Sequence, residues 1–491
     1  MYSQRMQMEI KTGEELARLH SRSTGLKMSH RSESFLDIKN VIEDDVTDTG
    51  LKRSRGPVSH GNGSLGTSAK KSKESSVCKL AQGLKALQEH ENDIAEVVIV
   101  CEPEQASLMM GGLHPRGSLY ERPVNIDVAK AQHAEFRAQL RAHGVKVLTV
   151  REILAYDVEE NMSARVDLED IAFSALEYKM EEGHSVSELP EEDRKYVSDD
   201  YKREVIEKMS TSQLVDTIMI NPTVVISPSH RDTGMSAAYG FHPLSNLVYT
   251  RDQQITTCKG LVMGRLRSQQ RQREVKVMEF CLNKLGLPVI GKIEEPGYLE
   301  GGDFFPCGTS LAMLGIGLRS NMEACQQLMD KDLLGTDRFA VVRDDFDKNQ
   351  DRMHLDCVFS IISSNCCIML EDIIGMDSPK RRLVDEFVKD AKTEKYALKR
   401  SGVEFSQYVR EEGYQIIPIK HEHQLAYACN VLNLGEGRMI SVHAPSARQI
   451  VKFPAFRGDV HVLEFSSITS MYGSVHCASQ VVRRVPKRFL Q

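Results

Sequence analysis

The chain has 491 residues and a formal net charge of −6 at pH 7, a mild balance that argues against a general nucleic-acid-binding protein with clustered basic side chains. No run of eighteen apolar residues occurs and the first twenty residues lack an apolar signal core, so the sequence predicts neither a membrane span nor secretion. The eleven cysteines are odd in number and irregularly spaced, which favours free thiols in a reducing compartment and a cytoplasmic protein.

Residues 1–90 differ in composition from the rest. The stretch LKRSRGPVSHGNGSLGTSAKKSKESS is rich in Ser, Gly and Lys and poor in apolar residues. Such a segment cannot bury enough surface to offset chain entropy. We therefore predict a disordered, basic and Ser-rich tail over 1–90, followed by a catalytic domain over 91–491.

A junction of helix, glycine and strand recurs along that domain. In DVAKAQHAEFRAQLRAHG, Ala129, His133, Phe136 and Leu140 share one helical face, Gly144 ends the helix, and VKVLTV reads as a buried strand. Similar junctions occur at Gly286, Gly335, Gly413 and Gly458. Five such units, with short strand hairpins between some of them, predict an α/β fold of the five-bladed propeller type. A doubly wound sheet is the alternative, but the short hairpins argue against it.

One segment interrupts the repeat. Residues 155–218 are highly charged, and Leu168, Ile171 and Leu176 belong to an apolar helical stripe. Ser210 and Gln213 fit a capping box. We predict a helical insertion over 155–218.

Four short segments place polar residues beside predicted strands: NLVYTRD (246–252), YLEGGD (298–303), MHLDCVF (353–359) and GSVHCASQ (473–480). Asp252, Glu300 and Asp356 would bring three carboxylates together, which repel unless a cation lies between them. A metal usually recruits several His or Cys ligands, and only His354 accompanies these carboxylates. A planar guanidinium fits carboxylates in bidentate geometry. Cys477 could then attack its central carbon while a histidine moves the protons.

Together the four segments resemble arginine deiminase, of the guanidino-group-modifying (pentein) superfamily, whose patterns N-x-x-[FY]-T-R-D, E-G-G-D, M-H-L-D and G-x-H-C appear here in order. Arg271 and Arg319 follow Asp252 and Glu300 by nineteen residues each, as in that family. The chain departs from it at Gln253, where the family has proline, and at Tyr472, where it has arginine.

The resemblance implies hydrolysis of L-arginine to L-citrulline and ammonia through an S-alkylthiouronium on the cysteine, without metal or organic cofactor. It implies the following roles: Cys477 is the nucleophile, His354 the general acid/base, Glu300 its support, Asp252 and Asp356 the guanidinium ligands, Arg271 and Arg319 the carboxylate ligands, and Asn246 orients the amino-acid end. His476 is expected to face away and carries no assigned chemistry. The predicted partner is a small molecule, and a homo-oligomer stays open. The alternatives are another guanidine substrate (agmatine or a methylated arginine), an amidinotransferase, or an arginine-binding protein without turnover.

Overall fold

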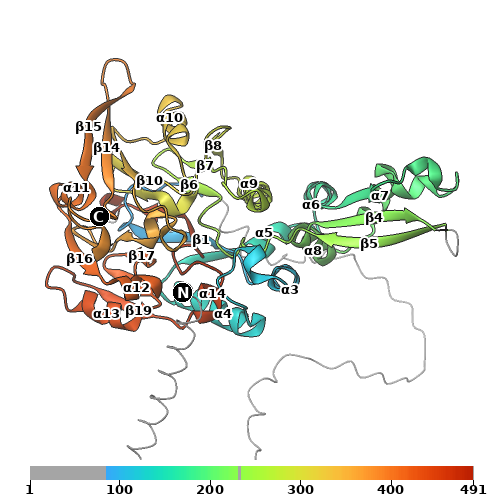
Figure 1. The fold of residues 1–491 in the computed structure, drawn as a ribbon, viewed down its shortest axis with the longest axis horizontal. Coiled ribbons are helices and arrows are strands. Elements are labelled where there is room, and N and C mark those ends of the chain that lie inside the picture. Colours follow the sequence, from blue (N-terminus) through green and yellow to red (C-terminus); the bar gives the residue numbers. More distant parts are fainter. Residues whose placement is uncertain (1–83, 230–233, 490–491) are drawn as a thin grey trace, which may run out of the picture. The chain divides into compact units, whose positions relative to one another are not determined.

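Six small β-sheets and the helices between them form the part of the chain that the structure, a computed structural model, describes: residues 84–229 and 234–489 (Figure 1). The fold is mixed α/β. Most of the predicted tail lies outside these residues. Within them, no helix is long and apolar enough to cross a membrane.

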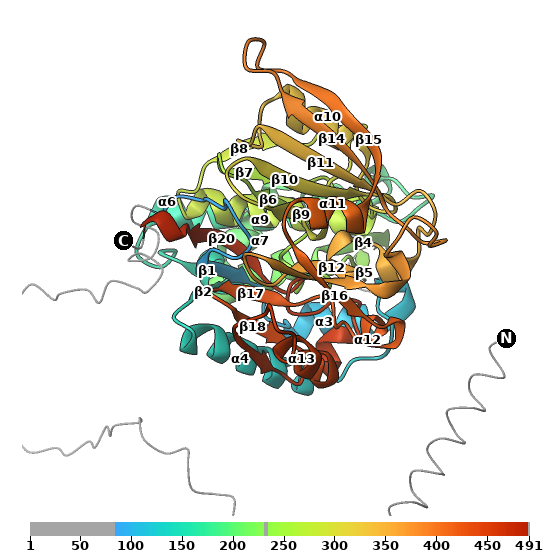
Figure 2. The same ribbon diagram turned by 90° about the vertical axis from the view of Figure 1, so that its left-hand side faces the viewer.

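Five of the sheets repeat one connectivity. A first strand pairs antiparallel with a second, and a helix then returns the chain to a third strand, which lies parallel to the second. The unit that joins the two ends of the domain is β20 (Gln480–Val485), β1 (Ile94–Val100), α4 (Ile126–Ala142) and β2 (Lys146–Thr149). The repeated unit predicted from the sequence is therefore present (Figure 2).

The other four units follow in chain order. They are β6 (Gln254–Thr256), β7 (Leu261–Met263), α9 (Gln272–Lys284) and β8 (Val289–Lys292); β9 (Phe304–Pro306), β10 (Leu311–Ile316), α10 (Met322–Asp330) and β11 (Arg338–Arg343); β12 (Phe359–Ile361), β13 (Cys366–Leu370), α11 (Phe405–Glu411) and β16 (Gln415–Ile419); and β17 (Leu432–Gly435), β18 (Arg438–Ser441), α13 (Ala444–Val451) and β19 (Asp459–Val462). A long hairpin, β14 (Leu383–Lys389) with β15 (Tyr396–Glu404), extends the sheet of β11. Short helices α3 (Gln105–Gly112), α5 (Val150–Ala155), α12 (His421–Leu425) and α14 (Ser466–Thr469) complete the units.

Helix α4 shows how the sequence specifies one unit. The Asn125 side chain caps its N-terminus by accepting from the Val128 backbone N–H. The predicted face is buried, with Ala129, Phe136 and Leu140 fully covered. After the helix, Gly144 has φ of 82°, a left-handed conformation that glycine adopts without a Cβ penalty.

The junction glycines are not all alike. Gly286, Gly335 and Gly413 are also left-handed. Gly458 is not among the positive-φ residues; a Cβ there would come within 2.0 Å of the Gly437 carbonyl oxygen. Glycine is needed at this fifth junction for close backbone approach and not for helix termination.

The predicted insertion contains more than helices. It forms α6 (Met162–Ala175), α7 (Asp199–Glu207) and α8 (Thr211–Ile220), the last with the predicted Ser210 capping box. It also contains β3 (Glu177–Met180), which pairs with β4 (Pro222–Pro228), itself paired with β5 (Met235–Phe241). The prediction of a helical insertion over 155–218 did not include β3, because this strand is short and half-exposed and its strand partners lie beyond the predicted boundary.

The C-terminal end of the predicted tail packs on the domain. Leu87 donates its backbone N–H to the Val482 carbonyl at 3.1 Å, and Gln88 donates its side-chain amide to Val481. Gln88 is buried, and its Oε1 accepts from buried Arg484. Residues 84–90 are therefore ordered, against the prediction of a tail up to 90; their polar side chains are satisfied by long-range partners that composition does not reveal.

Candidate active site

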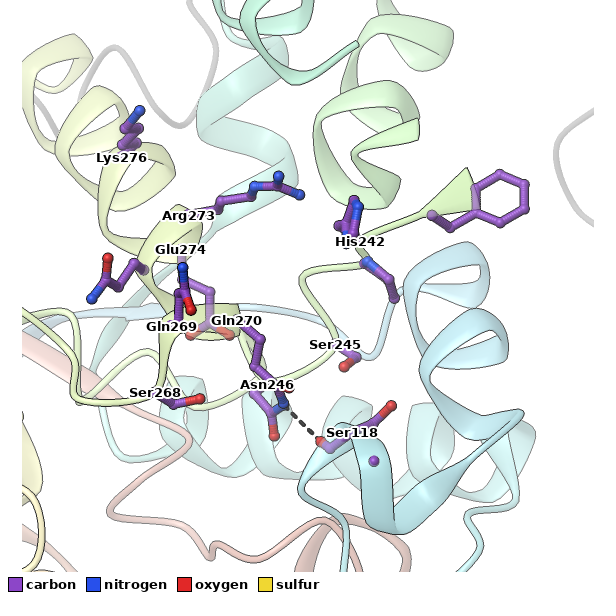
Figure 3. A pocket seen from close by; sticks show the side chains of 14 residues that line it. Ser118, His242, Ser245, Asn246, Ser268, Gln269, Gln270, Arg273, Glu274 and Lys276 are labelled. Atoms are coloured by element: carbon purple, nitrogen blue, oxygen red, sulfur yellow. Dashed lines mark hydrogen bonds between the residues drawn. The ribbon is translucent and has the colours of Figure 1, made fainter. Parts of the chain in front are cut away.

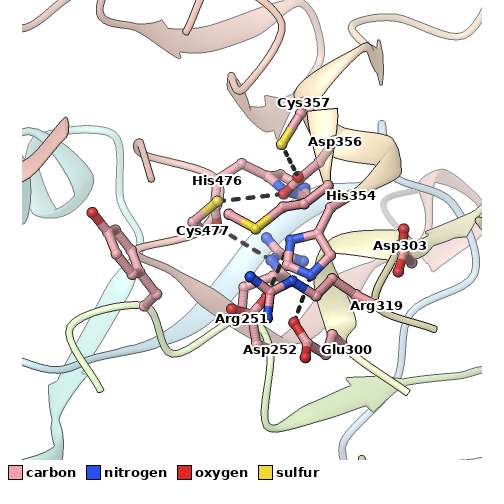
Figure 4. Close-up of polar contacts among 12 residues, drawn as sticks. Arg251, Asp252, Glu300, Asp303, Arg319, His354, Asp356, Cys357, His476 and Cys477 are labelled. Carbon is pink, nitrogen blue, oxygen red and sulfur yellow. Dashed lines mark hydrogen bonds and ion pairs between the residues drawn. The ribbon is translucent and has the colours of Figure 1, made fainter. Parts of the chain in front are cut away.

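The four predicted segments occupy one structural position. Asp252 lies two residues before β6, Glu300 precedes β9, His354 and Asp356 precede β12, and Cys477 precedes β20. Because the units repeat, these strand starts bring the side chains together from four parts of the chain (Figure 4). A small cavity of about 20 Å³ is lined by Asn246, Asp252, Arg271, Arg319, His354 and Cys477, among others.

His354 and Glu300 form a buried pair. Nε2 of His354 lies 2.7 Å from Oε2 of Glu300, whose Oε1 accepts the Arg267 backbone N–H at 3.0 Å. Burial alone would lower the pKa of His354, but the carboxylates of Asp252, Glu300 and Asp303 outweigh it and raise the pKa to about 10. Although burial opposes its ionisation, the His354 partner lowers the pKa of Glu300 to about 2. The imidazole is therefore protonated at neutral pH.

Arg271 lies beside Asp252, next to the His354–Glu300 pair. Its Nη1 is 2.8 Å from Oδ2 of Asp252, and its Nη2 is 3.0 Å from Oε2 of Glu274. Glu274 also accepts from the Gln253 amide at 2.8 Å, so the residue that stands in place of the family's proline is part of this network. The predicted carboxylate ligand Arg271 is thus paired with two protein carboxylates.

Cys477 lies beside Asp356 and Asn430. Its Sγ is 3.6 Å from Oδ2 of Asp356 and 3.2 Å from Nδ2 of Asn430. Burial, followed by the charges of Asp356 and Asp252, raises the pKa of the Cys477 thiol well above its usual value. Without a bound cation the sulfur is therefore a thiol.

Two buried polar atoms of the site face one another without a hydrogen-bond partner among the described residues. They are Oδ1 of Asp252 and Nδ1 of His354, which are 4.0 Å apart. Nε of Arg319 is also unpartnered and buried. Buried polar atoms are rarely left unsatisfied, and here they converge on one cavity.

A cation would fit this group. One ligand atom each from Asp252, Glu300 and His354 lies within 4.8 Å of the others, which would suffice for a metal. Nε2 of His354 pairs with Glu300, and its Nδ1 lies toward Oδ1 of Asp252. A planar guanidinium offers several N–H donors for these carboxylates and is the alternative to a metal.

We call Arg319 and Tyr472, with their partners Gln350 and Asp351, the outer wall of the site. Longer contacts hold these residues in place. Nη2 of Arg319 lies 3.3 Å from Oε1 of Gln350, and the Tyr472 hydroxyl lies 3.3 Å from Oδ1 of Asp351. Tyr472 has φ of 76°, an uncommon conformation for a residue with a bulky side chain. Asn246 lines the inner end, where its amide donates to the Ser118 carbonyl at 2.9 Å.

The sequence analysis missed three residues of the site. His476 was expected to point away on a strand, but residues 475–478 form a turn, and its Nδ1 lies 2.8 Å from Oδ2 of Asp356. Asn430 precedes β17 in the fifth unit, at the position that the four motifs occupy in theirs, and this positional equivalence was the available signal. For Glu274, within a charged helical stretch, the sequence offered no such signal.

The larger hollow nearby is a different feature. A cavity of about 760 Å³ lies between His242, Ser268 and Arg273 (Figure 3). Asn246 lines both cavities, and the backbone near Glu274 borders this one. It contains no cysteine, so the nucleophile candidate belongs to the smaller cavity.

Comparisons with known proteins identify the family of the chain. A sequence model of the arginine deiminase family matches residues 117–484. The arginine deiminase of Halobacterium salinarum is 23% identical over 324 residues, covering 50% of this chain and 65% of that protein. The arginine deiminase of Staphylococcus haemolyticus is 26% identical over 263 residues, covering 51% of this chain and 60% of that protein. The chain thus spans less than two thirds of the length of these relatives.

Solved structures were also matched at low identity. A dimethylarginine dimethylaminohydrolase adduct with 4-chloro-2-hydroxymethylpyridine is 15% identical with a TM-score of 0.44, covering 79% of this chain and 99% of that one. SxtG, an amidinotransferase from Microseira wollei in the saxitoxin biosynthetic pathway, is 14% identical with a TM-score of 0.48, covering 82% of this chain and 98% of that one.

The family match makes the chain a member of the enzyme superfamily that modifies guanidino groups. Within it, the match over residues 117–484 is decisive for the family. The chain belongs to the arginine deiminase family.

Proposed function

We propose that this protein hydrolyses L-arginine to L-citrulline and ammonia. The observation that supports this most is that Asp252, His354 and Cys477 line one cavity. Glu300 pairs with His354, and Asp356 lies beside the sulfur. The thiol becomes a nucleophile when it loses its proton, the imidazolium is a proton donor, and the carboxylates can bind a planar cation.

Substrate binding uses the unpartnered atoms. The guanidinium of the arginine substrate donates to Oδ1 of Asp252 and to Asp356. The α-carboxylate of the substrate pairs with Arg319, whose Nε has no hydrogen-bond partner among the described residues. Asn246 orients the amino-acid end. Arginine is far larger than a cavity of about 20 Å³, so its entry requires Tyr472 and the neighbouring outer wall to move.

The first chemical step forms a covalent bond to sulfur. The incoming guanidinium places a positive charge beside Cys477, which favours release of the thiol proton to solvent. The thiolate attacks the central carbon of the guanidinium to give a tetrahedral adduct. His354 donates its proton to one terminal nitrogen, the carbon–nitrogen bond breaks, and ammonia leaves. An S-alkylthiouronium remains on Cys477.

The second step reverses the histidine's role. Neutral His354 takes a proton from water, and the hydroxide attacks the thiouronium carbon to give a second tetrahedral adduct. The carbon–sulfur bond then breaks, and the hydroxyl proton of that adduct passes to solvent. This returns the Cys477 thiolate, the His354 imidazolium and citrulline. Glu300 stabilises the imidazolium in both steps through its 2.7 Å contact.

The same proposal includes the architecture. We take the five strand–strand–helix–strand units as the blades of a five-bladed propeller, closed by the pairing of β20 with β1. The site then lies where the first strands of the blades begin, with the insertion between two blades.

A different guanidine substrate is the second candidate. Agmatine has no carboxylate, and Arg319 with an unpartnered Nε favours a substrate that has one. An amidinotransferase would transfer the amidino group to an amine in place of water. A binding protein without turnover would show an arginine-dependent increase in melting temperature and no product.

The test is a substrate panel with purified full-length protein under reducing conditions. Arginine, agmatine and methylated arginines are each assayed for ureido product and released ammonia or amine, with and without an acceptor amine. Citrulline and ammonia from arginine alone support the proposal. A preference for another guanidine, or absence of citrulline at every pH tested, would reject it.

A further inference from the structure

Asn430 contacts the reactive sulfur through a side chain that no part of the proposed mechanism has used. It is buried, with 1% of its surface exposed, and lies two residues before β17. Its Nδ2 lies 3.2 Å from Sγ of Cys477, and its Oδ1 accepts the Cys477 backbone N–H at 3.3 Å. One amide therefore contacts both the backbone and the side chain of the same residue.

The orientation of this amide follows from its partners. A backbone N–H can only donate, so the atom that faces the Cys477 nitrogen must be the oxygen. The amide NH₂ must then face the sulfur and the Asp356 carbonyl, which lies 3.4 Å away. A flipped amide would place two donors against each other at the backbone.

The position of Asn430 is fixed by its neighbours. Its own backbone N–H donates to the Tyr427 carbonyl at 3.0 Å, and the preceding Cys429 carbonyl accepts from Ser360 at 2.8 Å. Ala428 and Cys429 are completely buried. The amide is therefore preorganised before any substrate arrives.

The carboxylates nearest the sulfur oppose its negative form. The charged and titratable groups around the thiol are Asp356, Asp252, His354, His476, Arg271, Arg319, Cys357, Tyr249, Tyr427 and Tyr472. The two nearest charges that act on it, Asp356 and Asp252, are carboxylates. Among the described residues, Asn430 provides the one side-chain N–H that donates to Sγ.

We infer that Asn430 is a further catalytic residue of this centre: its amide stabilises the Cys477 thiolate by an N–H···S hydrogen bond and aims the sulfur through the backbone contact. The inference rests on the proposed role of Cys477 as nucleophile. The amide donates to the thiolate that attacks, and again to the thiolate that leaves when water cleaves the thiouronium. No proton is transferred to or from Asn430.

The first readout is the ionisation of the thiol and needs no turnover. The full-length protein is alkylated with iodoacetamide across a pH series, and the modification of Cys477 is followed by mass spectrometry, with Cys477→Ser giving the background. Asn430→Ala removes the hydrogen bond, so the pH midpoint of alkylation rises by about one to two pH units. Asn430→Asp raises it further, because a carboxylate replaces the donor.

The matched control is Asn433→Ala. Asn433 is equally buried in the same segment, and its amide bonds to Asn92 and the Ile361 carbonyl without contacting the thiol. Its alkylation midpoint stays at the wild-type value. An unchanged midpoint in Asn430→Ala, or the same rise in Asn433→Ala, would overturn the inference.

The second readout is the deiminase reaction. Asn430→Ala lowers kcat for arginine by about 10- to 100-fold with KM within about threefold, because the contact acts on the nucleophile and not on substrate binding. A higher KM with an unchanged kcat in Asn430→Ala would contradict the catalytic role of this residue. If wild-type protein makes no citrulline but Asn430→Ala still shifts the thiol midpoint, the proposed function fails while the Asn430–Cys477 contact stands.

Discussion

The reaction centre around His354 and the outer wall around Tyr472 are held in different ways. At the centre, His354, Glu300 and Asp252 are almost completely buried and make contacts of 2.7–2.8 Å. At the outer wall, Arg319 and Tyr472 make single contacts of 3.3 Å. Charges removed from water are costly unless paired, so the centre must be assembled before substrate arrives, whereas the outer wall can move to admit it.

This difference assigns chemistry to the inner residues and substrate selection to the outer ones. Arg271, which the family resemblance assigns to the substrate carboxylate, belongs by its contacts to the inner group. Arg319 belongs to the outer group. Variants of the two regions should therefore fail in different kinetic parameters, kcat for the centre and KM for the outer wall.

The largest effect is expected at the inner pair. His354→Asn removes the proton donor, and Glu300→Gln removes the charge that keeps the imidazole protonated. Each should lower kcat by about 10³-fold, within the range of a lost general acid–base group. Steady-state citrulline assays measure this. If either variant kept the wild-type kcat and only its KM rose, these residues would act in substrate binding. The contrast between the centre and the outer wall would then fail.

The two arginines give the most direct test of the contrast. Arg319→Ala should raise KM for arginine by about 30-fold or more through loss of a carboxylate pair, and leave agmatine unchanged. Arg271→Ala should lower kcat for both substrates by about 10-fold or more, since Asp252 and Glu274 are left unpaired.

Arg271→Lys, which keeps the charge, controls for misfolding in the arginine series, together with melting temperatures of all variants. If Arg271→Ala raised KM for arginine alone, Arg271 would join the outer group, as the resemblance implies.

The pH above which activity falls should depend on the charged groups around His354. The proton donor is lost as pH rises through the His354 pKa of about 10, so activity should fall above that value. Asp303 raises this pKa without lining the cavity; it accepts from Ser320 and the Leu355 backbone. Asp303→Asn should move the alkaline midpoint down by about one pH unit in a pH–kcat profile. An unmoved midpoint would mean that another group sets the limit.

The smallest effect is expected at the outer wall. Tyr472→Phe removes one hydroxyl from a contact of 3.3 Å and keeps the ring. KM for arginine should change by no more than about threefold and kcat should not change, because a marginal hydrogen bond contributes little. A large loss of kcat would place Tyr472 in the chemistry.

The local signals of the sequence predicted much of this molecule. The face of α4, the Ser210 cap and the repeated helix–strand junctions depend on residues a few positions apart, and the structure confirms them. What failed depends on distant partners. His476 and Asp356 are 120 residues apart, and the orientation of the His476 ring follows from a turn that its strand-like surroundings did not indicate.

The ordered segment before β1 shows the same limit. Gln88 looks like a member of a polar tail, yet it contacts Arg484, near the other end of the chain. The insertion sheet was missed because β3 finds its partner β4 more than forty residues later. Composition and periodicity do not report such pairings.

The central claim is that Cys477 converts arginine to citrulline through a covalent intermediate. Wild-type protein and Cys477→Ser should be incubated side by side with isotopically labelled arginine, quenched in acid after short times, and analysed for citrulline and for intact protein mass. Wild type should form citrulline and carry a transient S-alkylthiouronium adduct on the peptide containing Cys477, and the serine variant should show neither. Citrulline formed by Cys477→Ser at the wild-type rate, or an adduct on another cysteine, would contradict the account.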